Sequence, residues 1–190
     1  MKRTSLKLSA PEINKKEFQF LNSLETYGTD DFIKWTTGFE EDLSKRLHSQ
    51  EVLALNSGTA AIHLGLILLG VTKGDEVICQ SLTFSASANP ILYQGATPVF
   101  VDSERLTWNL CPIALEKAIL DRLAKGKKPK AIIAVHIFGV PYQVDAIHAI
   151  ARRYEIPVLE DSAEALGSQY KKQCCGTFGD VGVLSGGFKL

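Results

Sequence analysis

The sequence has no excess of charge of either sign and no apolar run long enough to cross a membrane. Its 190 residues include 21 basic and 21 acidic side chains, whereas a protein that binds the phosphate backbone of a nucleic acid normally carries a basic excess. The most apolar stretch, residues 60–71, is interrupted by His63 and is far shorter than the roughly 20 residues of a membrane-spanning helix. We therefore expect neither a nucleic acid nor a membrane as a partner.

Cysteine is scarce, and its spacing argues against two common roles. Cys79, Cys111, Cys174 and Cys175 show no zinc-type spacing, so no metal site is predicted. The adjacent pair, Cys174 and Cys175, cannot form an ordinary unstrained disulfide. The beginning of the chain is positively charged but lacks the apolar centre of a secretory signal peptide. We expect reduced thiols and a cytoplasmic location.

Apolar residues are plentiful, and they fall in short runs that alternate with helical patterns. The runs are continuous and lack in–out alternation, which is typical of strands in a parallel sheet covered on both faces. The predicted fold class is therefore α/β, a mostly parallel sheet flanked by helices. Strands are predicted at residues 52–55, 76–79, 98–101, 131–135, 157–159 and 180–184, and helices at residues 60–69, 85–93, 112–124 and 144–154.

The first fifty residues have a different character. They are polar, and Phe39, Leu43 and Leu47 recur at four-residue spacing, which predicts an amphipathic helix over residues 37–48. We expect residues 1–50 to form an N-terminal helical segment and residues 51–190 to form the sheet domain. Because no closing helix follows the last predicted strand, we expect the sheet domain to be interrupted there.

A turn suited to phosphate binding follows the first predicted strand. Residues 56–59, Asn-Ser-Gly-Thr, lead directly into a helix. Such a turn offers backbone N–H groups and a hydroxyl at the positive end of the helix dipole. The alternative is that Ser57 or Thr59 merely caps the helix. The motif alone does not decide between them.

Two ring-bearing residues follow predicted strands. Phe84 lies beyond the strand at residues 76–79, where its ring could stack on a planar ligand or, more commonly, belong to the core. His136 ends the strand at residues 131–135. It could be a catalyst, although a lone histidine in such a place is more often a structural hydrogen-bonding residue.

Carboxyl and amino groups follow the last two predicted strands. Residues 160–164, Glu-Asp-Ser-Ala-Glu, end a buried strand, and a buried carboxylate must be paired or hydrogen-bonded. Asp161 could pair with a protonated pyridine nitrogen, or the segment could cap a helix. Lys189 lies in a glycine-containing loop beyond Ser185. A phosphate turn, an aromatic ring, a pyridinium partner and an amine are together what pyridoxal 5'-phosphate (PLP) requires.

Six motifs occur in a characteristic order over nearly the whole chain. They are NSGTAAIH at residues 56–63, KGDEV at 73–77, GATPVFVD at 95–102, VHIFGVP at 135–141, EDSAEALG at 160–167 and GTFGD at 176–180. This ordered set resembles the DegT/DnrJ/EryC1/StrS aminotransferases, the sugar aminotransferases of the type I PLP-dependent fold. The resemblance implies that the cofactor phosphate contacts Gly58 and Thr59, with Ser185 adding a hydroxyl from the other side.

The resemblance also implies roles around the cofactor ring. Phe84 would stack on the pyridine, and Asp161 would keep its nitrogen protonated. Lys189 would bind the cofactor covalently and later carry a proton between substrate and cofactor. Glu164 stands near the ring hydroxyl, where family members often have Gln or His. Three residues separate Ser185 from Lys189, one fewer than is usual in the family.

The reaction implied by the resemblance transfers an amino group from an amino acid, most simply glutamate, to a keto group of a nucleotide-linked sugar in polysaccharide, glycan or amino-sugar biosynthesis. A minority branch has histidine in place of the lysine and dehydrates its substrate, and Lys189 argues against that branch. Family members form homodimers and are about twice as long as this chain. We thus expect a partial large domain without the C-terminal small domain.

Two alternatives to an active transferase remain open. One is a catalytically inactive remnant that at most dimerises or binds the cofactor. The other is a nucleotide-binding module that uses residues 57–59 for phosphate, which the lack of a glycine fingerprint disfavours.

Overall fold

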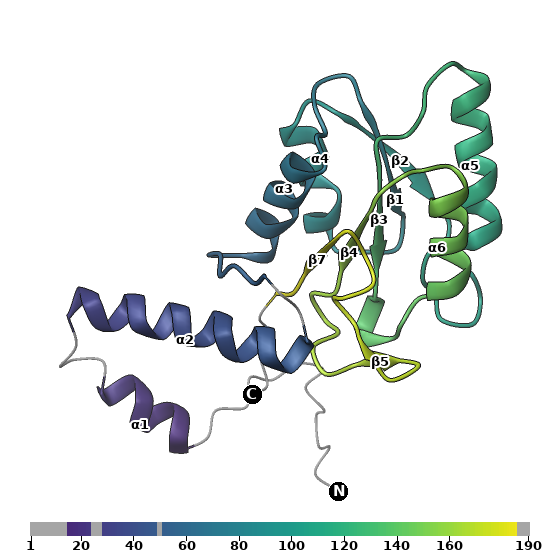
Figure 1. The fold of residues 1–190 in the computed structure, drawn as a ribbon. Helices are drawn as coiled ribbons and strands as arrows, with labels where there is room; N and C mark the ends of the chain where they lie inside the picture. The colour runs from purple at the N-terminus through teal and green to yellow at the C-terminus, as the bar shows by residue number, and fades with distance from the viewer. Residues whose placement is uncertain (1–14, 24–27, 49–50, 186–190) are drawn as a thin grey trace, which may run out of the picture.

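A parallel β-sheet is the centre of the fold (Figure 1). The computed structural model describes residues 15–23, 28–48 and 51–185. Within them the sheet has the strand order β2-β1-β3-β4-β7, and every neighbouring pair is parallel. The α/β prediction is therefore confirmed. The strands are β1 (Glu76–Gln80), β2 (Thr97–Val101), β3 (Ala131–Val135), β4 (Val158–Asp161) and β7 (Val181–Val183).

Helices cover both faces of this sheet. One face carries α3 (Gly58–Leu68) and α4 (Asn89–Tyr93), and the other carries α5 (Pro112–Ala124) and α6 (Val144–Arg153) (Figure 1). Successive β3 residues enter different cores: Ile132 packs in the cluster of α5 and α6, and Ile133 packs in the cluster of α3. All residues of β1, β3 and β4 are buried, which explains why their sequences read as continuous apolar runs.

Two helices lie in the described part of the N-terminal segment. It contains α1 (Lys15–Ser23) and α2 (Thr29–Leu47), and the amphipathic helix predicted at residues 37–48 is the C-terminal part of α2. The helix begins earlier because Asp31 accepts a 3.0 Å hydrogen bond from the Gly28 N–H at its first turn. Glu40 ties α2 to the sheet domain by accepting a 2.7 Å hydrogen bond from the Ala54 N–H.

The strand predicted at residues 52–55 is wrong. The segment is irregular, and Leu53 and Leu55 are 64% and 43% exposed. An apolar segment becomes a strand only when a neighbour completes its hydrogen-bond ladder. In the described part of the chain β7 is the last strand of the sheet on one side, and its outer edge is not paired with residues 52–55. The apolar composition alone therefore misled the prediction.

Two further local differences have a backbone cause. The single helix predicted at residues 85–93 is instead a 3-10 turn, η2 (Ser85–Ser87), followed by α4. Pro90 lies in the first turn of α4, where it lacks an N–H and disfavours helical conformation in the residue before it. A small hairpin of β5 (Gln169–Tyr170) and β6 (Gln173–Cys174) was not predicted.

The hairpin turn consists of two lysines in left-handed conformation. Lys171 and Lys172 have φ angles of 49° and 70°, as a two-residue turn of the mirror-image type requires. Glycine or asparagine normally marks such a turn, so the Lys-Lys pair gave no signal. A further 3-10 turn, η3 (Ile137–Gly139), follows β3.

Three further features of the described residues concern membrane-spanning helices, clusters of metal ligands and disulfides. None of the described helices has the length and apolar character that crossing a membrane would require. Among the same residues no three His, Cys, Asp or Glu side chains gather as a metal site would need. All four cysteines are free thiols, and burial raises the pKa of Cys79 and Cys175 to about 12.

Two leucines of α3 provide a test of the packing. Leu66 is fully buried, whereas Leu68 is 70% exposed. We expect Leu66→Ala to lower the free energy of unfolding by about 2–5 kcal/mol, because it leaves a cavity against the sheet. Leu68→Ala, the matched control, should change it by no more than about 0.5 kcal/mol. Urea unfolding followed by circular dichroism measures both, and equal losses would contradict the packing of α3 described above.

Candidate functional site

The candidate site residues gather at one edge of the sheet. In a parallel sheet the carboxyl ends of the strands lie at the same edge, which is where ligands bind in such folds. Asp161 ends β4, and its Cα is paired in register with Val135 of β3 and with Val183 of β7. Ser185 lies two residues beyond that point of β7. The chain therefore delivers residues from distant parts of the sequence to one place.

The N-terminus of α3 lies against the segment that follows β7. Ser57 is the N-cap of α3, and its hydroxyl accepts a 3.1 Å hydrogen bond from the Ala60 N–H, so the capping interpretation is confirmed for Ser57. Gly58 faces Ser185 so closely that a Cβ on the glycine would lie 2.6 Å from both Cβ and Oγ of the serine. The Ser185 hydroxyl thus stands beside the first turn of a helix.

This contact is suited to an anion. The first N–H groups of an α-helix have no intrahelical partner, and the helix dipole favours negative charge there. Thr59, the second residue of α3, brings a hydroxyl to the same turn. The structure therefore brings Gly58, Thr59 and Ser185 together at this turn, and capping by Ser57 does not compete with this use of the turn.

Asp161 is a buried carboxyl group with two hydrogen-bond donors. Its side chain is 3% exposed. Oδ2 accepts a 2.6 Å hydrogen bond from the Ser87 hydroxyl, and Oδ1 accepts a 3.2 Å bond from the Ala163 N–H. Burial raises the pKa of Asp161, although the Ser87 bond opposes that shift. Among the described residues no cation pairs with it, so a cationic ligand group would stabilise its ionised form.

Ser87 links Asp161 to the loop that carries Phe84. The Ser87 hydroxyl also lies 2.7 Å from the Thr83 hydroxyl, and Phe84 follows directly. The Phe84 ring is 78% exposed, so the interpretation of Phe84 as a core residue is wrong. Nothing in the sequence indicated the roles of Ser87 and Thr83, because Ser87 and Asp161 are 74 positions apart. A hydrogen bond between residues so distant in the chain leaves no local pattern.

Glu160, the neighbour of Asp161 in β4, is satisfied in a different way. It is fully buried, and its Oε1 lies 2.7 Å from Nε2 of His136. Nδ1 of His136 accepts a 3.3 Å hydrogen bond from the Tyr142 N–H, so the ring proton must be on Nε2 and points to Glu160. This arrangement fits the structural role for His136. The helix-capping alternative for residues 160–164 is wrong, because the residues after β4 form turns.

Of the two remaining predicted site residues, Glu164 is described and Lys189 is not. Glu164 is exposed, and its Oε2 accepts a 2.6 Å hydrogen bond from the Phe138 N–H. It therefore holds the turn after β3 rather than standing free. Lys189 lies outside the described residues, so its distance from Asp161 is not part of the observed geometry.

Comparison with known proteins identifies the family. The family model described as the DegT/DnrJ/EryC1/StrS aminotransferase family matches residues 11–186. EpsN of Bacillus subtilis (strain 168), by its name a candidate pyridoxal phosphate-dependent aminotransferase, is 51% identical over 147 residues, which are 77% of this chain and 38% of EpsN. GDP-perosamine synthase of Escherichia coli O157:H7 is 38% identical over 176 residues, which are 92% of this chain and 47% of the synthase.

A solved structure shows the same fold. Spr1654 of Streptococcus pneumoniae in its PLP form, by its name a candidate sugar aminotransferase, has a TM-score of 0.80 and 31% sequence identity. The match covers 93% of this chain and 47% of Spr1654. The chain therefore belongs to the DegT/DnrJ/EryC1/StrS aminotransferase family, whose members are PLP-dependent enzymes. It spans less than half the length of these relatives.

The buried carboxyl group predicts a pH-dependent effect on stability. Because the pKa of Asp161 is raised by folding, this group stabilises the fold below its unfolded pKa of about 3.9, and the contribution is lost as the pH rises through the folded pKa. We expect Asp161→Asn to make the cofactor-free protein more stable relative to wild type at pH 7 than at pH 4. Urea unfolding at the two pH values measures the difference.

Asp145→Asn is the control, and its effect should have the opposite sign. Hydrogen bonds from Lys171 and Tyr170 lower the pKa of the exposed Asp145 carboxyl, so its contribution is present at neutral pH and is lost as the pH falls. If the two substitutions showed the same pH dependence, the environment assigned to Asp161 would be incorrect.

Proposed function

We propose that this chain forms the PLP-binding part of an aminotransferase that moves an amino group from an amino acid, glutamate, to the keto group of a nucleotide-linked sugar. The observation that carries this proposal is the arrangement at the sheet edge. Asp161 is a buried carboxyl group that no cation of the described residues pairs with, and the N-terminus of α3 faces Ser185. The similarity to GDP-perosamine synthase supports a sugar substrate carried on a nucleotide.

The residues at the α3 end fit the phosphate of the cofactor. Gly58 has no room for a Cβ, because Ser185 already lies 2.6 Å from the place it would take, so only glycine would let Ser185 and the phosphate both lie close to the backbone of the first turn. Gly58 and Thr59 would bind it through N–H groups and the Thr59 hydroxyl, and Ser185 would donate a further hydrogen bond. No basic side chain is needed, because the helix dipole and these donors already favour a dianion.

The residues around Asp161 fit the pyridine ring. Asp161 would accept a hydrogen bond from the protonated ring nitrogen, and Ser87 would keep the carboxylate oriented for it. Phe84, already exposed at this edge, would cover one face of the ring. Glu164 would approach the ring hydroxyl. When bound, PLP supplies an electron sink for the negative charge that develops at the substrate carbon.

Lys189 and Asp161 would have different roles in proton transfer. We propose that Nζ of Lys189 takes the proton from Cα of the amino-acid donor and returns one on the way to product. Asp161 would remain ionised and hold a proton on the ring nitrogen, since a cation within hydrogen-bond distance favours the charged carboxylate. Binding of the cofactor should therefore reverse the rise in pKa that burial causes at Asp161.

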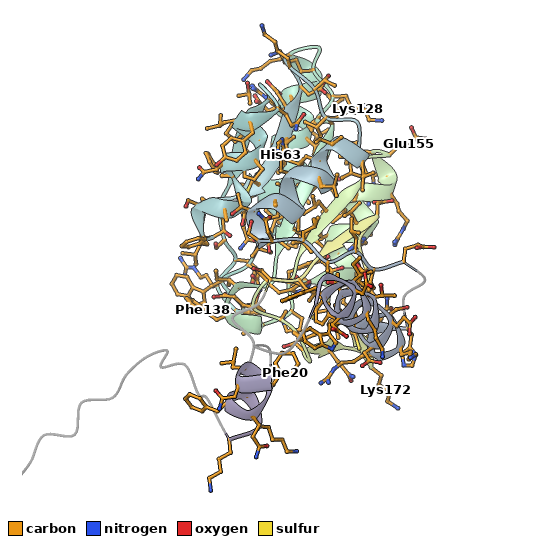
Figure 2. The ribbon with its side chains drawn as sticks, turned by 90° about the vertical axis from the view of Figure 1, so that its left-hand side faces the viewer. Phe20, His63, Lys128, Phe138, Glu155 and Lys172 are labelled. Atoms are coloured by element: carbon orange, nitrogen blue, oxygen red, sulfur yellow. The ribbon has the colours of Figure 1, made fainter. Side chains whose placement is uncertain are left out.

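The proposal extends to the setting of the enzyme. Residues 1–50 would be an N-terminal helical segment, and residues 51–190 would be part of the large domain. We propose a homodimer for the full-length enzyme, because Leu106, Trp108 and Phe138 expose apolar surface that a second copy could cover. Phe138 lies at the periphery of the molecule in Figure 2. The free thiols of all four cysteines support the cytoplasm as its location.

Covalent trapping of the cofactor tests the proposed function. PLP is added to the purified protein, the absorbance is recorded in the near-ultraviolet and visible range, and the complex is reduced with borohydride. We expect a reduced adduct that mass spectrometry maps to Lys189. Addition of glutamate before reduction should prevent the adduct, and Asp161→Asn should slow that reaction. Absence of any adduct would instead favour a fragment without catalytic function.

Gly58→Ala tests the phosphate end of the site separately. The added Cβ would collide with Ser185, so we expect PLP to bind at least about tenfold more weakly, which corresponds to the loss of a single charged hydrogen bond. Gly38→Ala in α2 is the matched control, because a Cβ there meets nothing within 4 Å. Equilibrium dialysis measures both. Unchanged affinity in Gly58→Ala would remove Gly58 from the proposed phosphate site.

A further inference from the structure

The side chain of Glu160 is fully buried and takes part in five hydrogen bonds with the described residues. Besides Nε2 of His136, its Oε1 accepts bonds from the Gly176 N–H at 2.6 Å and from the Ser162 hydroxyl at 3.2 Å. Its Oε2 accepts bonds from the Phe178 N–H at 2.7 Å and the Gly179 N–H at 3.0 Å. Within the described chain its partners are therefore three backbone N–H groups, one hydroxyl and one imidazole nitrogen.

These donors keep the carboxylate ionised although it is fully buried. Burial by itself opposes ionisation, but the bonds from His136 and from the Gly176 and Gly179 N–H groups lower the pKa of Glu160. The negative charge of Glu160 also contributes, after burial, to the raised pKa of Tyr142 and of Cys175.

The donors come from two places that matter for the site. His136 directly follows β3, and its backbone N–H donates a 3.0 Å hydrogen bond to the Asp161 carbonyl, so it also fixes the backbone of Asp161. Residues 176–179 are the segment that leads into β7 and then to Ser185. Glu160 therefore holds together the strand end that carries Asp161 and the segment that delivers Ser185.

Residues 176–179 have little room to move if their hydrogen bonds to Glu160 are lost. Gly182 in β7 packs against it so tightly that a Cβ on Gly182 would lie 2.0 Å from the Gly176 carbonyl oxygen. Gly179 is equally close to the sheet, since a Cβ there would lie 2.7 Å from the Val158 carbonyl oxygen. A shift of residues 176–179 would therefore be transmitted to β7 and to Ser185.

We propose that Glu160 is a positioning residue of the cofactor site, which fixes residues 176–179 so that Ser185 meets Gly58 at a set distance from Asp161. This inference rests on the function proposed above. Glu160 does not touch the cofactor, because its side chain lies with His136 on the α5 and α6 face of the sheet, whereas Asp161 contacts Ser87. Its effect on binding would be indirect.

Glu160→Gln is the informative substitution. The amide has nearly the same shape but replaces one acceptor oxygen by an NH₂ group, which would face the N–H groups of Phe178 and Gly179 or that of Gly176. His136 cannot relieve the conflict by moving its proton to Nδ1, since the Tyr142 N–H already occupies that nitrogen. In one orientation or the other, at least one backbone donor loses its acceptor.

Tyr142→Phe is the matched control. The Tyr142 ring is buried and stacks on His136 with 4.4 Å between ring centroids. Its hydroxyl lies 2.9 Å from Nε2 of His148 and makes no bond to residues 176–179. The substitution removes a buried hydrogen bond from the same cluster while leaving every donor of Glu160 in place, so it reports the effect of destabilisation alone.

The test uses the whole chain and three measurements. Amide hydrogen exchange of residues 176–179 is measured in the cofactor-free protein, and the dissociation constant of PLP by equilibrium dialysis. Circular dichroism of bound PLP at saturation reports its orientation. For Glu160→Gln we expect exchange at these amides to be at least about tenfold faster, PLP binding to be about tenfold weaker or worse, and the dichroism of bound PLP to fall. For Tyr142→Phe we expect wild-type values in all three.

Each outcome decides the question. If Glu160→Gln unfolds, Ser162→Ala removes one donor of Oε1 more gently and should show the same changes at a few-fold level. Suppose that Glu160→Gln folds and binds PLP with wild-type affinity and dichroism. This result would overturn the positioning role of Glu160 but leave the proposed function standing. If Glu160→Gln unfolds, the same result in Ser162→Ala would have the same meaning. Equal losses in Tyr142→Phe would assign Glu160 to stability only. If wild type itself binds no PLP, the proposed function fails, and the positioning role fails with it.

Discussion

Two consecutive carboxyl groups end the same buried strand, and the cost of burying their charge governs the structure around them. Along a strand successive side chains point to opposite faces, so Glu160 and Asp161 meet different surroundings. Glu160 is supplied with five donors and is stable as an anion without a ligand. Asp161 has two donors and no cation within the described residues. The first carboxylate organises the protein, and the second remains available to a cationic ligand.

This difference connects the core to the proposed chemistry. The parallel sheet brings the ends of β1, β4 and β7 to one edge, but strand order alone does not set the positions of loops. Hydrogen bonds fix the positions of the loops on both faces of the sheet. On one face Ser87 bonds both Thr83 and Asp161 and so ties the loop after β1 to β4. On the other face Glu160 ties the segment before β7 to β4. The proposed cofactor would thus meet groups already ordered before it binds, which lowers the entropy lost on binding.

The sequence was most informative where local signals and burial agree. The bounds of α5 were predicted because Pro112 starts the helix and its apolar residues repeat with helical spacing, and β3 was predicted because Ala131–Val135 is a continuous apolar run. The resemblance to the family also implied that Gly58 and Ser185 lie close together, and they do. The helix and the strand depend on residues close together in sequence, whereas the place of Gly58 came from the ordered motifs and not from the strand predicted before it.

Features that depend on a distant partner could not be predicted from the sequence. Residues 52–55 have the composition of a strand, but whether they become one depends on what pairs with them. The bond between Ser87 and Asp161 joins residues 74 positions apart, and Ser87 had been assigned only to a helix. Glu160 was recognised as a buried carboxylate that needs partners, but its five donors come from loops whose course the sequence does not specify.

The contact between Gly58 and Ser185 also connects ligand binding with folding. An anion held there would bridge the beginning of α3 and the end of the described sheet, two segments that come together only when the whole chain has folded. Such a ligand binds the native state and not the unfolded one, so its concentration adds directly to the stability of the protein. Under the function proposed above, inorganic phosphate in a storage or assay buffer would therefore both stabilise this fold and compete with the cofactor.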